Sequence, residues 1–177
     1  MKTEREILEP MPGFSREIGF YLSAMEEIRS RTRKTVEDLS DEENARKILP
    51  NLQPIGRLIL HIGEAEFWWI QSIVAGVEMD DEMHRMAHSD DWEKDDFAEK
   101  GYGTKYCTEA IDKISQMNRE FLANLADEDL EKIHILKKPD KEVHLSLRRI
   151  LLHLSEHEAA HTGQISMLKR LLRESNN

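Results

Sequence analysis

Apolar residues recur at steps of three and four along four long stretches of the chain, the spacing that places them on one face of an α-helix. The stretches span residues 15–38, 54–76, 104–126 and 146–173. The second is well bounded, because Pro54 suits the first position of a helix and Gly76 the position just past its end. We therefore expect four long helices that pack through their apolar faces.

The segments between these helices are less regular. Ser40 and Glu43 have the spacing of a capping box, which predicts a short helix that ends before Pro50. Residues 78–100 are acidic and methionine-rich without a clear period, and they predict a long, partly helical crossover. Residues 132–136 and 142–145 flank a turn and predict a short hairpin.

Together these elements predict an all-α fold with a single domain over residues 1–177. The architecture expected is a four-helix bundle, with a long crossover between the second and third helices and a short hairpin before the last.

Composition narrows the classes of partner. Among 177 residues, 25 are basic and 35 acidic, and the net charge of −10 argues against nucleic acid as a partner. No stretch has the roughly 20 apolar residues of a membrane span, and the N-terminus lacks the apolar core of a signal peptide. We expect a soluble, cytoplasmic protein without membrane contact. Cys107 is the only cysteine, so any metal must be bound by His, Asp or Glu.

Two histidines interrupt the apolar face of the last predicted helix. His157 and His161 are four residues apart in a stripe that also contains Ile150, Leu154, Ile165, Leu168 and Leu172. Burying polar groups without partners costs about 1–3 kcal/mol each. The two rings therefore either bond within the core or share one divalent cation, as histidines at i and i+4 do.

A third histidine favours the metal. His61 lies between Leu58 and Ala65 on the second helix, which is apolar over a wide arc, so its ring also points into the protein. Three imidazoles bind a divalent ion and leave a position open for water or substrate. Nitrogen ligands favour zinc, nickel, iron or copper over magnesium and calcium.

The second and last helices carry further matching residues. They are His61, Glu66 and Trp69 on the second helix, and the run His157-x-x-x-His161-Thr-Gly-Gln-Ile165 on the last. These segments resemble the DinB superfamily of small metal-binding four-helix bundles. The resemblance implies that His61, His157 and His161 bind a divalent metal, zinc or nickel. Many relatives have His and Arg where this chain has Ala160 and Thr162, a departure that spares the ligands.

The resemblance also implies a reaction class. Characterised members of the superfamily include transferases that attach a low-molecular-weight thiol (bacillithiol, mycothiol or glutathione) to an electrophile. A metal with an open position lowers the pKa of a bound thiol. We accordingly expect a metal-dependent transferase or hydrolase whose partners are a small-molecule thiol and electrophile, and we expect a homodimer.

The residues leave other interpretations open. The segment His157-Glu158-Ala-Ala-His161 has the His-Glu-x-x-His spacing of zinc proteases, with Glu158 as the general base. No histidine follows His161 to complete that site. Glu158 and His161 also have the spacing of one half of a di-iron site, which requires the motif twice. A non-enzymatic, metal-binding stress-response protein is the remaining alternative.

Three further residues lie near the predicted ligands. Glu64, one turn from His61, either orients that ring by a hydrogen bond or is a surface carboxylate. His153, one turn before His157, is a fourth ligand, a donor to a ligand or a structural histidine. Trp68 shares the face of His61 and either lines the cleft or anchors the core.

Overall fold

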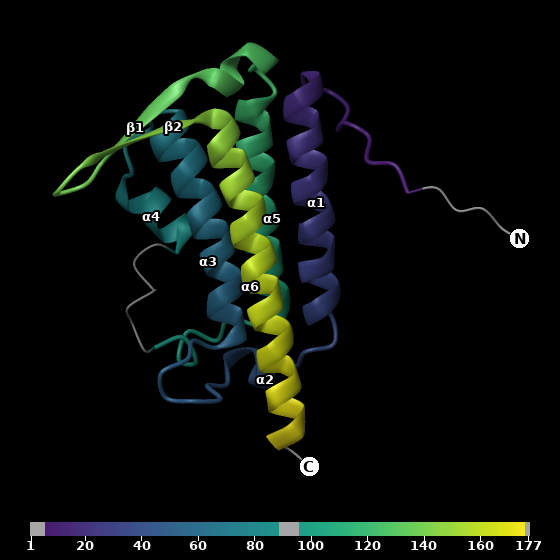
Figure 1. Ribbon diagram of the computed structural model, residues 1–177. Coiled ribbons are helices and arrows are strands. Elements are labelled where there is room, and N and C mark those ends of the chain that lie inside the picture. Colours follow the sequence, from purple (N-terminus) through teal and green to yellow (C-terminus); the bar gives the residue numbers. More distant parts are fainter. Residues whose placement is uncertain (1–5, 89–95, 176–177) are drawn as a thin grey trace, which may run out of the picture.

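The computed structural model describes residues 6–88 and 96–175 and is mostly helical (Figure 1). The longest helices lie side by side and are α1 (Arg16–Val36), α3 (Ile55–Phe67), α5 (Thr104–Leu122) and α6 (Leu147–Ser175). Helix α3 packs against α5 and α6, and α1 packs against α6. The prediction of a mainly helical chain is confirmed.

Shorter elements join the long helices. Two of them, α2 (Asp41–Ala45) and α4 (Asp81–Ala87), are helices, and a 3-10 turn, η3, spans Asp127–Glu131. Helix α4 lies beside α3 rather than at an end of the long helices (Figure 1). The Ser40–Glu43 capping box is present at the start of α2. The predicted crossover over residues 78–100 contains α4, and its residues 89–95 lie outside the described part of the chain.

The hairpin before the last helix is confirmed. Strands β1 (Ile133–Lys137) and β2 (Glu142–Ser146) pair antiparallel, with Ile135 opposite His144. The hairpin lies at one end of the long helices, and α2 lies at the other (Figure 1). The two strands are the part of the described structure that departs from an all-α fold.

The second predicted helix changes geometry halfway. After Phe67 the α-helix continues as a π-helical segment, η1 (Trp68–Val74), in which the amide of Ala75 donates to the carbonyl of Ile70 five residues earlier. The helical path then ends at Gly76, whose φ of +71° favours glycine. The predicted end is therefore correct, whereas a continuous α-helix to that end is wrong. π-helical segments of this kind occur often at functional sites.

The hydrophobic core has two large parts, besides a smaller cluster of Phe67, Ala87 and Ile114. One part includes Val36, Ile62, Ile111 and Ile165, and the other includes Leu22, Ile70, Leu122 and Leu154. Helices α1, α5 and α6 contribute to both parts, whereas α3 contributes to the first and its continuation η1 (Trp68–Val74) contributes Ile70 to the second. Each long helix also has a buried polar side chain, which lies between the residues of the first part and those of the second.

We call these side chains the polar layer. Its members are at most 3 % exposed and are Arg29 and Thr32 of α1, Glu66 of α3, Asn118 of α5 and Glu158 of α6. The Arg29 guanidinium donates from Nε to Glu158 Oε1 at 2.7 Å and from Nη2 to Glu66 Oε2 at 2.8 Å. Burial disfavours the charge of Arg29, but these two carboxylates outweigh that effect and raise its pKa. One cation thus joins α1, α3 and α6.

Hydrogen bonds extend the layer to the other helices. Asn118 donates to Glu66 Oε1 at 3.2 Å and accepts from Gln71 of the π-helical segment at 2.8 Å. The Thr32 hydroxyl lies 3.0 Å from Glu158 Oε1 and 2.7 Å from the hydroxyl of Thr162. The buried carboxylates therefore have the partners that burial requires.

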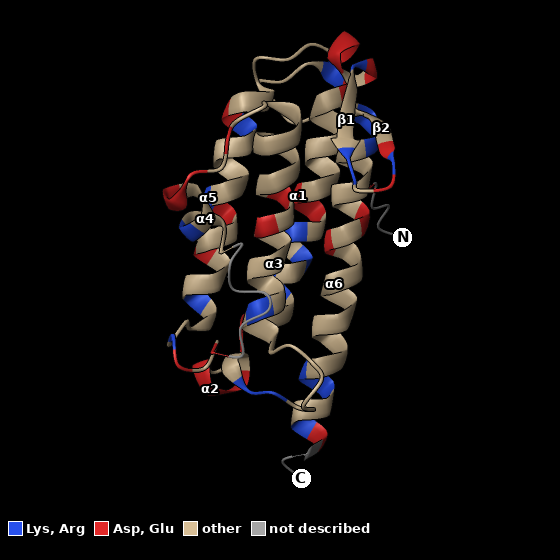
Figure 2. Ribbon diagram, turned by 90° about the vertical axis from the view of Figure 1, so that its left-hand side faces the viewer, with Lys and Arg blue, Asp and Glu red and all other residues tan. Residues whose placement is uncertain are grey.

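Charges on the surface are mixed. Figure 2 shows both Lys or Arg and Asp or Glu positions scattered over the helices. Among the described residues, no helix is both long and apolar enough to cross a membrane.

We predict that Arg29→Met lowers the free energy of unfolding by about 3–5 kcal/mol, because it leaves two buried carboxylates without their cation. Urea unfolding of the chelator-treated protein measures the change. The control is Arg33→Met, one turn along α1. Arg33 is 36 % exposed where it pairs with Asp112 and Glu26, and its loss is expected to cost less than about 1 kcal/mol.

Replacing both carboxylates by glutamine in the Arg29→Met background should restore part of the lost stability, since the unpaired charges are then removed. Equal destabilisation by Arg29→Met and Arg33→Met would show that the buried ion pairs do not hold the helices together.

Candidate metal centre

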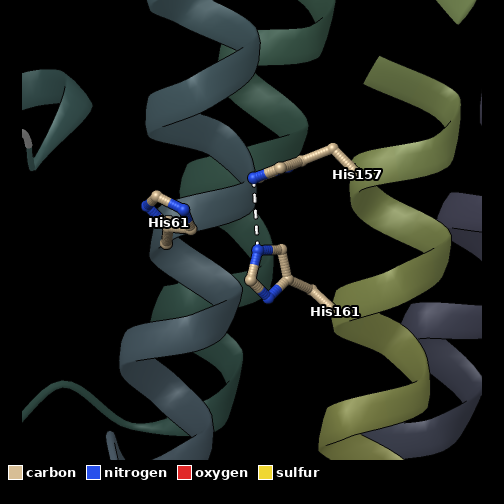
Figure 3. A group of neighbouring side chains, drawn as sticks. All are labelled: His61, His157 and His161. Atoms are coloured by element: carbon tan, nitrogen blue, oxygen red, sulfur yellow. Dashed lines mark hydrogen bonds between the residues drawn. The ribbon is translucent and has the colours of Figure 1, made fainter. Parts of the chain in front are cut away.

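The structure brings the three predicted histidines together between α3 and α6 (Figure 3). His61 extends from α3, and His157 and His161 extend from successive turns of α6. One ring nitrogen from each lies within 4.8 Å of the other two. The sequence predicts inward-facing rings, and the structure places all three half-buried. They are therefore shielded from bulk water without being sealed from small molecules.

Two of the rings are oriented by neighbours three residues along their own helices. His61 Nδ1 lies 2.9 Å from Glu64 Oε2, and His161 Nδ1 lies 2.7 Å from Gln164 Oε1. Because a carboxylate or amide oxygen can only accept, each Nδ1 carries the hydrogen. This tautomer gives Nε2 the lone pair, and a carboxylate behind a histidine is the usual support of a metal ligand.

A buried arginine supports Glu64 in turn. Arg57 Nη2 lies 3.5 Å from Glu64 Oε2, and the Arg57 side chain is 1 % exposed. A chain of contacts thus runs from Arg57 through Glu64 to the ring of His61. The hydrogen bond that the sequence suggests for Glu64 is present.

Burial keeps the rings on α6 neutral. It lowers the pKa of His157 to about 4, with further contributions from the neighbouring rings of His161, His61 and His153. Burial also lowers the pKa of His161, against the opposing effect of its hydrogen bond to Gln164. Neutral imidazole is the form that binds metal, so neither ring would have to lose a proton at pH 7 to bind one.

The geometry fits a shared divalent ion. His157 Nε2 and His161 Nε2 are 3.2 Å apart (Figure 3). Two nitrogens bound to one tetrahedral zinc at about 2.0–2.1 Å are separated by about 3.3 Å. The ring centroid of His61 lies 5.1 Å from the centroids of both His157 and His161, so the third ring lies close to both others.

Glu158, the candidate general base, lies outside this cluster of rings. It follows His157 directly, but its carboxylate belongs to the polar layer, where it accepts from Arg29 and is 3 % exposed. Of these adjacent residues of α6, His157 therefore belongs to the histidine cluster and Glu158 to the core.

Two tryptophans and a further histidine lie next to the cluster on the side of the hairpin. Trp68 is 37 % exposed and contacts Trp69 edge to face, with the ring centroids 4.8 Å apart. Trp69 in turn contacts His153, whose ring lies 5.8 Å from that of His157. His153 is thus a neighbour of the cluster rather than one of its three converging histidines.

Cys107 is not suited to act as a nucleophile at neutral pH. It is fully buried, and desolvation raises the pKa of its thiol to about 12. A thiol rather than a thiolate is present at pH 7, and a thiol is a poor nucleophile.

Sequence reasoning missed one residue of the polar layer and one residue beside the histidines. Arg29 occupies a position of the apolar stripe of α1, four residues after Met25, and a charged residue at such a position was a signal for a buried ion pair. Gln164 follows His161 by three residues, the same spacing that relates Glu64 to His61. That repeated spacing was the signal for a residue that orients the ring.

Comparison with solved structures supports the fold. A DinB-like protein from Bacillus cereus ATCC 10987 superimposes with a TM-score of 0.62 at 20 % identity, over 86 % of this chain and 91 % of that one. A conserved protein from Enterococcus faecalis superimposes with a TM-score of 0.67 at 12 % identity, over 85 % and 94 % of the two chains. No curated protein matches the chain.

Comparison with protein families gives the assignment. The profile of the mycothiol S-transferase family matches residues 21–175, a span that includes α3, α5, α6, most of α1 and the three histidines between α3 and α6. The chain therefore belongs to the mycothiol S-transferase family of the DinB superfamily.

Proposed function

We propose that this protein is a metal-dependent transferase that joins a low-molecular-weight thiol to a small electrophile. His61, His157 and His161 hold one divalent transition metal, zinc or nickel. The observation that carries the proposal is the convergence of three imidazole nitrogens from α3 and α6. Family membership supports the reaction class, and we take the long helices to form the four-helix bundle of DinB proteins.

A divalent metal held by three imidazoles keeps a position for a further ligand and lowers the pKa of a thiol placed there. The chain's own residues hold the metal and orient the histidine rings. Glu64 and Gln164 fix two of the rings so that Nε2 faces the shared point. The polar layer sets the separation of α3 from α6, on which the distance from His61 to the other two rings depends.

The nucleophilic sulfur belongs to a co-substrate in this proposal. The chain's only cysteine is buried and holds its proton at neutral pH. The two partners are then a small thiol and a small electrophile, as the sequence predicts.

The position of Glu158 favours a transferase over a zinc protease. A general base must reach the proton that it removes. The Glu158 carboxylate instead accepts from Arg29 and lies close to the Thr32 hydroxyl within the core, which favours a structural role. A non-enzymatic metal-binding protein would have the same three-histidine site, and activity measurements separate it from the transferase.

We predict that the purified protein retains about one divalent metal per chain and that alanine at His61, His157 or His161 releases it. The reason is that two imidazoles cannot hold the ion as three do. Elemental analysis after dialysis gives the metal content. Glu64→Leu should weaken metal binding by about 10–100-fold, the usual effect of removing a residue that supports a ligand.

His144→Ala is the matched control, because His144 lies on the exposed hairpin and should not affect the metal. Full metal content in the His157 and His161 variants would refute the assignment of the ligands.

We predict that the metal-loaded protein conjugates monochlorobimane with at least one of bacillithiol, mycothiol and glutathione, and that a chelator abolishes turnover. Cys107→Ala should keep the activity, since the nucleophile comes from the co-substrate. Fluorescence of the conjugate measures the rate.

Full metal content without conjugation of any thiol would instead support the non-enzymatic protein. Peptide hydrolysis that Glu158→Gln abolishes would support the zinc protease.

A further inference from the structure

A cavity adjoins the histidine cluster on the side away from the hairpin. Its volume is about 310 Å³, and it lies where α3, α6 and the segment before α3 meet. Leu58 of α3 lines it one turn before His61, and Gln164 of α6 lines it while its side-chain oxygen bonds to His161. Three residues of helix rise only about 4.5 Å, so the cavity begins next to the ligands.

The described residues that line this cavity carry no charge. They are Asn51, Leu52, Gln53, Leu58, Gln164, Met167 and Leu168. Charged residues make up 34 % of the chain, so a lining without any differs clearly from the average composition. Met167 is 66 % exposed and Leu52 37 %, which leaves apolar surface at the cavity wall in contact with water. Covering such surface is favourable for an apolar ligand.

The cavity on the other side of the cluster differs in charge. It has a volume of about 180 Å³ and is lined in part by Lys138, Arg149 and His153. His153 contacts His157, so the two cavities flank the three histidines along α6. A neutral, apolar molecule is favoured in the uncharged cavity, whereas the basic one favours anions.

We propose that the uncharged cavity between Leu58 and Met167 binds the apolar, uncharged part of the electrophile and presents its reacting atom to the histidine cluster. The inference rests on the proposed function and adds the substrate class. The volume agrees with that of small-molecule sites, which begin near about 300 Å³. Gln164 lies at the boundary between the cavity and the histidine cluster, because its side chain both lines the cavity and orients His161.

Binding can be tested without turnover. The zinc-loaded protein, labelled with ¹³C at the methionine methyl groups, is titrated with syn-(methyl,methyl)bimane, which lacks the reactive chlorine of monochlorobimane. The Met167 methyl resonance should shift and saturate, and that of Met25, which is 8 % exposed in the core, should not. The loss of one resonance in Met167→Leu assigns the signal.

A charge placed in the cavity should weaken binding. Met167→Glu is expected to raise the bimane dissociation constant and the KM for monochlorobimane at least 10-fold, without loss of metal. The KM for iodoacetamide, a small polar electrophile, should change less than threefold. Leu152→Glu is the matched control, because Leu152 is an exposed apolar residue of the same helix at 43 % exposure and should alter neither value.

The outcomes separate this inference from the proposed function. Saturable shifts at Met167 in a protein that conjugates no thiol would support the cavity and contradict the transferase. If the protein conjugates a thiol but the bimane does not shift the Met167 resonance, the inference on the cavity is overturned and the proposed function stands. A Met167 signal that depends on protein concentration and not on the bimane would also overturn it, because a second copy of the chain would then cover the cavity.

Discussion

One buried cation, the guanidinium of Arg29, determines how the helices of this protein meet. Its ion pairs with Glu66 and Glu158 join α1 to α3 and to α6 at the level where the hydrophobic core is divided. Apolar contacts alone tolerate small shifts of one helix along another, whereas a buried ion pair is satisfied in a single register. We attribute to Arg29 the register of α3 against α6, consistent with the role of buried polar groups in specifying unique packing.

The ligand cluster depends on that register. His157 and Glu158 are neighbours on α6, so the contact that fixes Glu158 in the core also fixes His157 at the outer face. On α3, His61 precedes Glu66 by little more than one turn and is further held by Glu64 and Arg57. A shift of α6 by one turn would displace His157 and His161 by about 5.4 Å along the helix axis. That displacement exceeds the 4.8 Å within which the three ring nitrogens now lie. The packing of the core therefore also fixes the relative positions of the three histidines.

The helices and the three histidines could be predicted from the sequence because their signals are local. Apolar periodicity marks the helices, and spacings within single helices mark His157 and His161 as neighbours. The role of Arg29 could not be obtained in this way, because its partners lie 37 and 129 residues away. The π-helical segment was also missed, since a hydrophobic stripe of seven residues does not distinguish it from an α-helix. The cavity beside Gln164 arises only where separate segments meet.

The central claim is that three imidazoles bind one metal and leave a position for a thiol. X-ray absorption spectroscopy of the metal-loaded protein tests it most directly. We expect three imidazole nitrogens at about 2.0–2.1 Å and, after addition of the thiol co-substrate, a sulfur at about 2.3 Å. A metal surrounded by oxygen ligands without imidazole scattering, or a spectrum that the thiol leaves unchanged, would contradict the account.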